Sequence, residues 1–298
     1  MKKKILVLLR AKDIRKTKEK NSAIWRWVED CRKDYEIKFW GRDLSVDGNY
    51  SLWGGEFTEK QMLFELKKKI DVFKPDFLYL TQRKEYLHWL PAPNQNRLLD
   101  FTSITVPKIY VEVDSQYYDV NDPWYKQFDV LKCREPSFNG WDKVPLFRWS
   151  VPEISFPVKP SKRKGIYLIG QIREQIYPER KQLKRLFYKH IKFKKNIYSS
   201  IYWEMMHNAS CLVCPTESVF GDFTPAKLFE YLSSGAAVLT NCDFKKAGIP
   251  ELEQFAIKYK NFKDLITKLS MDFTPYHDKA IPSMREHTHR IRYKELFG

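Results

Sequence analysis

The sequence predicts an α/β protein with two Rossmann-like domains, each built around a parallel sheet. Three observations carry this prediction: apolar runs alternate with helical patterns in both halves, 298 residues suit two domains, and prolines interrupt the alternation near the middle. Strands that are apolar on both faces and separated by helices are typical of parallel sheets covered on both sides. We therefore expect a first domain over residues 1–150 and a second over residues 151–298, facing each other across a cleft.

The first half of the chain has the pattern of a βαβαβ unit. The expected strands are residues 5–9, 35–39, 77–80 and 108–113, with short additions at 129–131 and 146–147, and the expected helices are residues 23–31 and 59–73. The prolines between residues 145 and 160 break this rhythm and indicate the linker. The lysines at the start precede an apolar run too short for a signal peptide, so this run predicts a buried strand.

The second half repeats the alternation. The expected strands are residues 165–169, 211–214 and 236–240, and the expected helices are residues 179–188, 201–208, 226–233, 261–270 and 285–296. Ligands of open parallel sheets bind at the carboxyl ends of the strands, where loops lead into helix N-termini. We therefore expect the functional residues directly after the strands.

Composition limits the partners without choosing among them. Lysine and arginine number 53 against 37 aspartates and glutamates, a net charge of +16, which favours nucleotide phosphates, nucleic acid or acidic lipid headgroups. The five cysteines are odd in number and mostly lie in apolar runs, as expected of reduced thiols in a cytoplasmic protein. No apolar stretch reaches 18 residues, so we expect no transmembrane helix.

The strongest signal is a strand–loop–helix–glycine–strand window in the second half. Thr224 is the expected N-cap and Pro225 the first helical residue, so free backbone amides point into the loop, where a phosphate binds well. Lys227 lies in the first turn, where a cation opposes the helix dipole and indicates an anion nearby. Glu230 lies three residues on, on the same helical face, and Gly235 has the position of a C-cap glycine.

This window resembles the donor-site segment of family 4-like glycosyltransferases, which have the GT-B fold of two Rossmann-like domains. In that family a glutamate binds the ribose hydroxyls of the nucleotide and a lysine faces the diphosphate, which implies these roles for Glu230 and Lys227. Asp222 precedes Glu230 with seven residues between, similar to the E-x7-E pattern of retaining members but with aspartate in the first place. This departure leaves the role of Asp222 and the stereochemical outcome open.

Other stretches extend the resemblance. Residues 165–173, followed by Tyr177-Pro-Glu-Arg180, and residues 286–292 resemble the spore-maturation-protein branch of these enzymes, and residues 106–114 resemble that branch's strand ending in aspartate. The resemblance covers the C-terminal half well and the N-terminal half loosely. It implies a UDP- or GDP-sugar as the donor substrate, with no cofactor required.

Three further residues near strand ends have both a functional and a structural interpretation. Gly170 and Arg173 follow an expected strand, as a phosphate-binding glycine and arginine would, although this half holds many arginines. Asp114 closes a strand of the first domain and is either a general base for the acceptor hydroxyl or the cap of the next helix.

A bound metal ion is not expected. Cys211 and Cys214 have zinc-like spacing without a second pair, and the sequence contains no Asp-x-Asp motif. In GT-B enzymes lysine, arginine and helix dipoles neutralise the leaving diphosphate instead.

A basic segment follows the first expected strand and should border the cleft on the acceptor side. Its cations are Arg10, Lys12, Arg15, Lys16, Lys18 and Lys20. Such a segment suits an anionic acceptor. If the acceptor is a base in DNA, it must leave the stack and meet aromatic side chains, for which Trp25, Trp27, Trp53 and Trp89 are candidates, although core packing is the commoner use of each.

The sequence thus predicts a glycosyltransferase with Asp114 and Asp222 as catalytic candidates and an anionic acceptor. Hydroxymethylated DNA is slightly favoured as the acceptor over a surface polysaccharide or a lipid-linked sugar. The alternative from another class is a non-catalytic basic protein that binds nucleic acid, which would not bind a nucleotide sugar. The sequence leaves the sugar, the nucleotide and the oligomeric state open.

Overall fold

The chain forms two compact units. The computed structural model describes residues 1–8, 23–42, 50–52, 59–80, 99–112, 118–134, 140–157, 162–170, 172, 177–195, 197, 199–218, 221–222 and 226–298. Unit 1 comprises Met1–Arg148 and Tyr293–Gly298, and unit 2 comprises Trp149–Arg292. Sequence analysis assigned the whole C-terminal helix to the second domain, whereas its final residues, Tyr293–Gly298, pack within unit 1.

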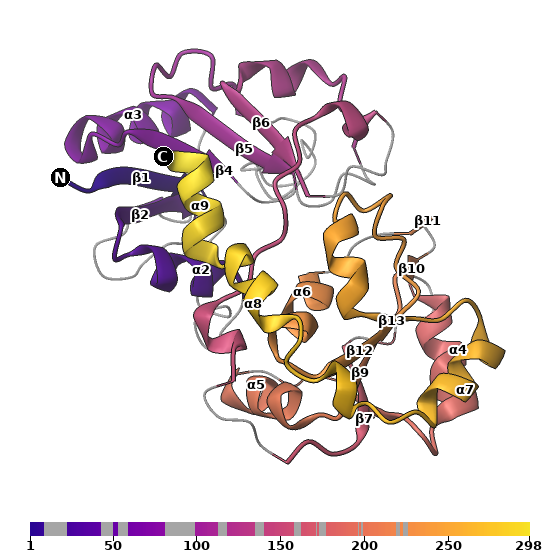
Figure 1. Cartoon of the computed structure of the whole chain (residues 1–298). Helices are drawn as coiled ribbons and strands as arrows, with labels where there is room; N and C mark the ends of the chain where they lie inside the picture. Colours follow the sequence, from indigo (N-terminus) through magenta and orange to yellow (C-terminus); the bar gives the residue numbers. More distant parts are fainter. Residues whose placement is uncertain are drawn as a thin grey trace. The chain divides into compact units, whose positions relative to one another are not determined.

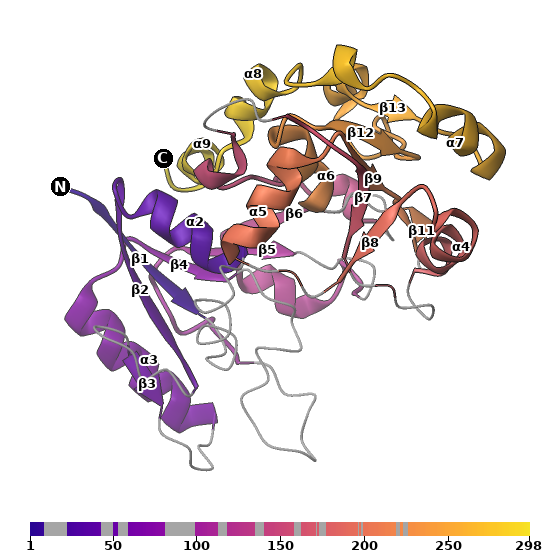
Figure 2. The ribbon, with the colours of Figure 1, turned by 90° about the horizontal axis from the view of Figure 1, so that it is seen from below.

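Unit 1 contains a six-stranded parallel sheet in the order β3-β2-β1-β4-β5-β6 (Figures 1 and 2). The strands are β1 (Lys3–Leu8), β2 (Tyr35–Arg42), β3 (Tyr50–Leu52), β4 (Phe77–Leu80), β5 (Lys108–Glu112) and β6 (Val130–Cys133). This is the strand order of a doubly wound Rossmann sheet, whose direction of winding reverses between β1 and β4. The predicted α/β class is confirmed for this half.

Both faces of the unit 1 sheet are covered by helices, which explains the continuous apolar run of β1. The helices are α2 (Ala23–Cys31), α3 (Glu59–Phe73), the end of α9 (His289–Phe297), and the 3-10 turns η3 (Pro123–Gln127) and η4 (Trp141–Lys143). Ile5 and Val7 pack with the side chains of α2 and α9, while Leu6 and Leu8 pack with those of α3. The predicted buried first strand is therefore confirmed.

Unit 2 contains a five-stranded parallel sheet in the order β13-β12-β9-β7-β8. The strands are β7 (Ile166–Ile169), β8 (Lys192–Lys194), β9 (Cys211–Cys214), β12 (Ala237–Thr240) and β13 (Ile257–Lys258), beside a hairpin of β10 (Glu217–Ser218) and β11 (Gly221–Asp222). Winding reverses between β7 and β9. Sequence analysis did not predict β8 and β13, because these short edge strands alternate with lysines and lack an apolar run.

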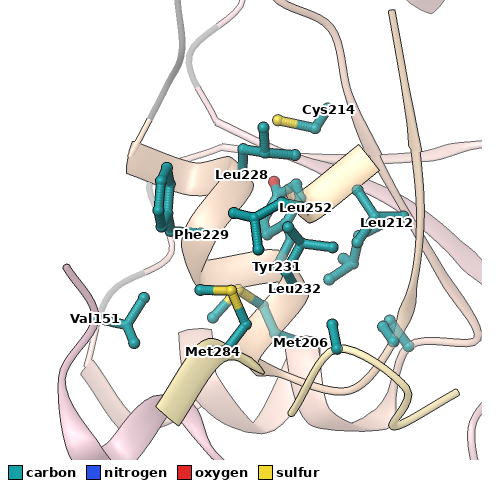
Figure 3. Close-up of a cluster of buried hydrophobic side chains, with 14 of the residues drawn as sticks. Val151, Met206, Leu212, Cys214, Leu228, Phe229, Tyr231, Leu232, Leu252 and Met284 are labelled. Atoms are coloured by element: carbon teal, nitrogen blue, oxygen red, sulfur yellow. The ribbon is translucent and has the colours of Figure 1, made fainter. Parts of the chain in front are cut away.

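Two apolar cores cover the two faces of the unit 2 sheet. The helices are α4 (Pro178–Phe187), α5 (Ser199–Asn208), α6 (Ala226–Ser233), α7 (Phe262–Leu269) and α8 (Ile281–Met284), with 3-10 turns η5 (Glu153–Ser155), η6 (Pro250–Phe255), η7 (Thr274–Tyr276) and η8 (Arg285–His287). Leu212 of β9 packs with α5, α6 and α8 (Figure 3), and Val213 packs with α4 and α7. The alternation along β9 thus buries both faces.

Helix α6 ends as the sequence predicts. Its last residue is Ser233, and Gly235 has a φ of +75°, the left-handed conformation that favours glycine. The expected N-cap Thr224 and first-turn proline Pro225 lie outside the described residues. Over the part of the chain that the structure describes, no helix is both long and apolar enough to cross a membrane.

Candidate functional site

The carboxyl edge of the unit 2 sheet brings three elements together at Gly170. This glycine directly follows β7 and has a φ of +152°, which L side chains rarely adopt. A Cβ added to it would lie 3.4 Å from Arg180 Nη1, in the first turn of α4, and 3.4 Å from Lys227 Cε, in the first turn of α6. A guanidinium and the end of a lysine side chain therefore lie beside a glycine at the reversal of the sheet, where such folds bind ligands.

A tyrosine hydroxyl connects the two residues of α6 that the sequence singled out. Lys227 Nζ donates a hydrogen bond to Tyr202 Oη at 3.1 Å and lies 4.7 Å from the centroid of that ring. The Tyr202 hydroxyl in turn donates to Oε2 of Glu230. Lys227 and Glu230 thus share one face of α6, as their spacing predicts, but they are joined through Tyr202 of α5.

The environment of Lys227 disfavours its positive charge. Burial lowers the pKa of Lys227, and the nearby guanidinium of Arg180 lowers it further, while Glu230 acts in the opposite direction. Arg180 is itself 6% exposed, and its guanidinium lies 4.0 Å from the centroid of the Tyr177 ring. An anion placed between these two cations would favour the charged form of both.

A buried polar network fixes the same edge of the sheet. Both carboxylate oxygens of Glu179 accept from Asn241 Nδ2, at 3.2 and 3.1 Å, and Oε1 accepts from the Tyr259 hydroxyl at 2.8 Å. Asn241 Oδ1 accepts from the Thr216 backbone amide at 2.9 Å. Thr216, Asn241 and Tyr259 follow the ends of β9, β12 and β13, so Glu179 ties the start of α4 to three strand ends.

The predicted donor residues have different outcomes. Gly170 and Lys227 lie together, and Glu230 connects to them through Tyr202. The backbone of Asp222 pairs with Glu217 in the β10–β11 hairpin, and its side chain is outside the described part. Arg173 and Thr224 also lie outside the described residues.

Sequence reasoning missed Arg180 and Tyr202 as site residues. The signal for Arg180 is Pro178, a proline at the first helical position, because it places Arg180 in the first turn beside the preceding strand end. Tyr202 carries no comparable signal, since it is one of two adjacent aromatic residues in a helix whose apolar residues do not form a clear stripe. Only the packing of α5 against α6 brings its hydroxyl to Lys227.

The acceptor-side candidates lie outside the described residues. They are Arg10, Lys12, Arg15, Lys16, Lys18 and Lys20, and so is the catalytic candidate Asp114. Trp53, Trp89 and the side chain of Trp25 are also outside, whereas Trp27 is 2% exposed and stacks on Tyr293 with centroids 4.4 Å apart. Trp27 therefore belongs to the core of unit 1, which corrects its candidacy as a stacking partner for a base.

A buried carboxylate that the sequence did not single out stands at the end of β5. Glu112 is 0% exposed, and its Oε2 accepts from the hydroxyls of Tyr110 at 2.9 Å and Tyr125 at 3.0 Å. These bonds stabilise the carboxylate inside the core of unit 1. Glu112 thus fixes the strand end two positions before Asp114.

The cysteine pair of β9 does not form one ligand set. Cys211 packs into the core with α4 and α7, and Cys214 packs into the core with α5 and α6. Burial raises the pKa of Cys214 to about 12, so its thiolate is disfavoured. Within the described ranges, no group of three or more His, Cys, Asp or Glu side chains could hold a metal ion.

Comparison with known proteins identifies the fold. No model of a protein family matches the chain, and no curated protein matches it in sequence. Among solved structures, it is similar to a glycosyltransferase from Rickettsia africae (TM-score 0.58, 10% identity, 99% of this chain and 98% of that chain). It is also similar to AviGT4, a glycosyltransferase of avilamycin A biosynthesis (TM-score 0.55, 10% identity, 99% and 96%).

A third similar structure is a UDP-GlcNAc 2-epimerase from Neisseria meningitidis bound to UDP-GlcNAc, with a TM-score of 0.53, 11% identity, and 99% and 98% coverage. All three similarities span nearly the full length of both chains. At these low sequence identities they show a shared fold and not a shared activity. The protein has an α/β, GT-B-like two-domain fold.

Proposed function

We propose that this protein is a nucleotide-sugar-dependent glycosyltransferase that binds a UDP- or GDP-sugar at the carboxyl edge of the unit 2 sheet. The observation that carries the proposal is the convergence of Gly170, Arg180 and Lys227 at the point where the sheet reverses. Two cations beside a glycine, where no side chain blocks the approach of a ligand, suit a diphosphate. The motif resemblance supports the spore-maturation-protein-like branch within this fold.

Each site residue has a proposed role. Gly170 lets the backbone approach the diphosphate, and Lys227 and Arg180 neutralise its charge. The Glu230 carboxylate accepts one hydrogen bond from Tyr202 and has further lone pairs, with which it accepts from the ribose hydroxyls. On sequence grounds we also assign Arg173 and Thr224 to donor binding and Asp114 and Asp222 to catalysis. No metal ion is needed for this chemistry, because the cations face the leaving group.

Nucleotide binding tests the donor site directly. A nucleoside diphosphate at 100 times its dissociation constant stabilises a protein by about 2.7 kcal/mol, so UDP or GDP should raise the melting temperature. We expect Lys227→Met to weaken binding at least tenfold, whereas Lys246→Met, at an exposed lysine of unit 2, should bind normally. Unchanged melting temperatures with UDP, GDP and ADP would refute the donor site and leave the non-catalytic nucleic-acid-binding alternative.

The fold is shared with UDP-GlcNAc 2-epimerases, so the reaction needs its own test. Incubation with UDP-GlcNAc alone distinguishes the two activities. An epimerase changes the configuration of the sugar while the nucleotide stays attached, whereas a glycosyltransferase releases UDP when an acceptor takes the sugar. Formation of an epimeric UDP-sugar without acceptor would replace our proposal.

For the acceptor we propose an anionic polymer, with hydroxymethylated DNA favoured over a surface polysaccharide or lipid-linked glycan. The support is the basic segment after the first strand, including Arg10, Lys12, Arg15 and Lys16, and the net charge of +16. Radiolabelled UDP-glucose and other sugar donors, incubated with hydroxymethylated and unmodified DNA, test this assignment. Absence of transfer to either hydroxymethylcytosine or hydroxymethyluracil DNA would leave the polysaccharide and lipid-linked glycans as acceptors.

A further inference from the structure

The unit 2 sheet opens at its reversal point. Strands β7 and β9 pair only through Ile166 with Cys211 and Tyr167 with Leu212. On its other side, β7 stays paired with β8 through Ile169, and the Gly170 amide extends this pairing to the Lys194 carbonyl at 2.9 Å. Successive residues of a strand direct their backbone groups to opposite sides, so the amide and carbonyl of Ile169 point to the opening.

The hydroxyl of Tyr231 fills this opening. It accepts from the backbone amide of Ile169 at 3.2 Å and donates to the carbonyl of the same residue at 2.9 Å. Tyr231 belongs to α6 and is 1% exposed, with its ring in the core shown in Figure 3. One side chain thus replaces both ladder bonds that a neighbouring strand would have made, and no buried backbone group of Ile169 is left unpaired.

We propose that Tyr231 is a positioning residue for the donor site: its hydroxyl holds the end of β7 open and fixes Gly170 in front of Lys227 and Arg180. This inference rests on the proposed function. Tyr231 is buried, so we place it behind the donor site and not in contact with the ligand. It acts through Ile169, which precedes Gly170 in the chain.

The position of Tyr231 on α6 couples the two halves of the site. Lys227 lies one turn before Tyr231 on the same helix, and Glu230 is its immediate neighbour. The two hydrogen bonds therefore set the distance between the helix that carries Lys227 and the strand end that carries Gly170. Without them, either element can shift, and a misplacement of about 1 Å in a site of this kind can cost about 100-fold in rate.

The test compares two variants that each remove one buried hydroxyl. Tyr231→Phe keeps the ring and removes both bonds to Ile169, and Tyr79→Phe, in unit 1, removes a bond between the Tyr79 and Tyr293 hydroxyls at 3.3 Å. Two quantities are measured in each protein: the dissociation constant for UDP and the hydrogen-exchange rate of the Gly170 amide. We expect Tyr231→Phe to weaken UDP binding about tenfold and to speed exchange at Gly170 about tenfold, with Tyr79→Phe unchanged in both.

The outcomes separate this inference from the proposed function. If the unaltered protein binds UDP and Tyr231→Phe binds it equally well, the positioning role is refuted while the donor site stands. If both variants weaken UDP binding equally, the effect is general destabilisation and the role is again refuted. If the unaltered protein binds no nucleotide, the proposed function fails, and unchanged exchange at Gly170 would then refute the control of Gly170 by Tyr231 as well.

Discussion

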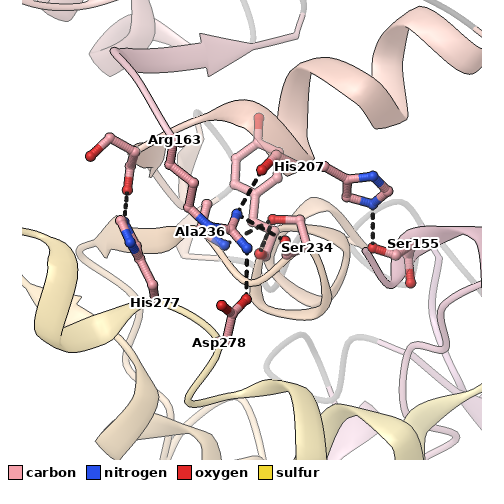
Figure 4. A network of polar contacts seen from close by, with 9 residues as sticks. Ser155, Arg163, His207, Ser234, Ala236, His277 and Asp278 are labelled. Carbon is pink, nitrogen blue, oxygen red and sulfur yellow. Dashed lines mark hydrogen bonds and ion pairs between the residues drawn. The ribbon is translucent and has the colours of Figure 1, made fainter. Parts of the chain in front are cut away.

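The amino edge and the carboxyl edge of the unit 2 sheet each hold a buried cation, but the two cations have different partners. At the amino edge, Arg163 precedes β7 and donates to the His207 carbonyl at 2.8 Å, to the Ser234 carbonyl at 3.2 Å and to Asp278 Oδ1 at 2.6 Å (Figure 4). The side chain of Arg163 is 4% exposed. A Cβ on Gly235 would collide with both members of the Arg163–Asp278 pair. This cation therefore lies in a closed network in which it donates to two carbonyls and one carboxylate.

At the carboxyl edge, the corresponding cation is Lys227, and its partners differ from those of Arg163. The hydrogen bond of Lys227 goes to the neutral hydroxyl of Tyr202, and the carboxylate of Glu230 lies one bond further on. The carboxylate of Glu179 accepts hydrogen bonds from the neutral donors of Asn241 and Tyr259. Among the described residues, no carboxylate is bound directly to Lys227, which suits an anionic ligand near Gly170.

Burial of a cation does not by itself indicate a functional site. Arg163 caps the C-terminal ends of two helices. It donates to the carbonyl of His207 at the end of α5 and to that of Ser234 at the end of α6, where the helix dipole is negative. Lys227 begins a helix, where the dipole is positive and its own charge is disfavoured. The first arrangement stabilises the fold, and the second suits the bound anion that we propose for this site.

The largest expected effect comes from breaking the amino edge. Arg163→Ala removes the donors to both helix ends and leaves Asp278 without its partner. We expect a loss of about 3 kcal/mol, the lower end of the range for a broken buried ion pair, because the side chain of Asp278 is 41% exposed. Urea unfolding measures this loss. Arg163→Lys keeps the positive charge but cannot reach all three acceptors at once, so it should lose less free energy of unfolding. An Arg163→Ala variant as stable as the unaltered protein would contradict the structural role.

An intermediate effect is expected at the carboxyl edge. Gly170→Ala forces an L side chain into a φ of +152° and directs its Cβ toward Arg180 and Lys227. We expect UDP to bind about tenfold more weakly, equivalent to about 1.4 kcal/mol. Gly248→Ala is the matched control, because Gly248 also has a positive φ, +72°, but lies after β12 outside the site. Isothermal titration calorimetry measures the affinity of both variants for UDP. Equal affinities would show that Gly170 is not part of the nucleotide site.

The smallest expected effect is a pH dependence that belongs to the amino edge alone. Burial lowers the pKa of His207 below its ordinary value of 6.5, although its bond to the Ser155 carbonyl acts the other way. The unfolded chain then takes up a proton at higher pH than the folded protein, so stability is lost as the pH falls through about 6.5. His207→Gln keeps an N–H donor for Ser155 and does not titrate.

The measurement compares the free energy of unfolding at pH 7.5 and 5.5 in both proteins. We expect the unaltered protein to lose more stability than His207→Gln over this interval. UDP affinity should respond equally to pH in the two proteins, because His207 contacts the amino edge and not Gly170 or Lys227. Identical losses of stability would show that His207 titrates normally in the folded protein.

The fold class and the helix at the centre of the site could be predicted from the amino-acid sequence. Runs such as Ile5–Leu8 are apolar on both faces because two helical layers cover the sheet, and this pattern is visible without coordinates. Local rules also predicted Gly235 as the end of α6 and the shared face of Lys227 and Glu230, since helix periodicity and glycine conformation depend on near neighbours only.

The distant groups that meet these residues could not be predicted from the sequence, because they depend on how the elements pack. Tyr202, Arg180 and Tyr231 reach the site through the packing of α4, α5 and α6 on the sheet, and no sequence spacing encodes those contacts. The same holds for Trp27 and Tyr293, which stack although most of the chain separates them. Local periodicity fixes the direction in which a side chain points, whereas the partner it meets depends on how elements far apart in sequence pack together.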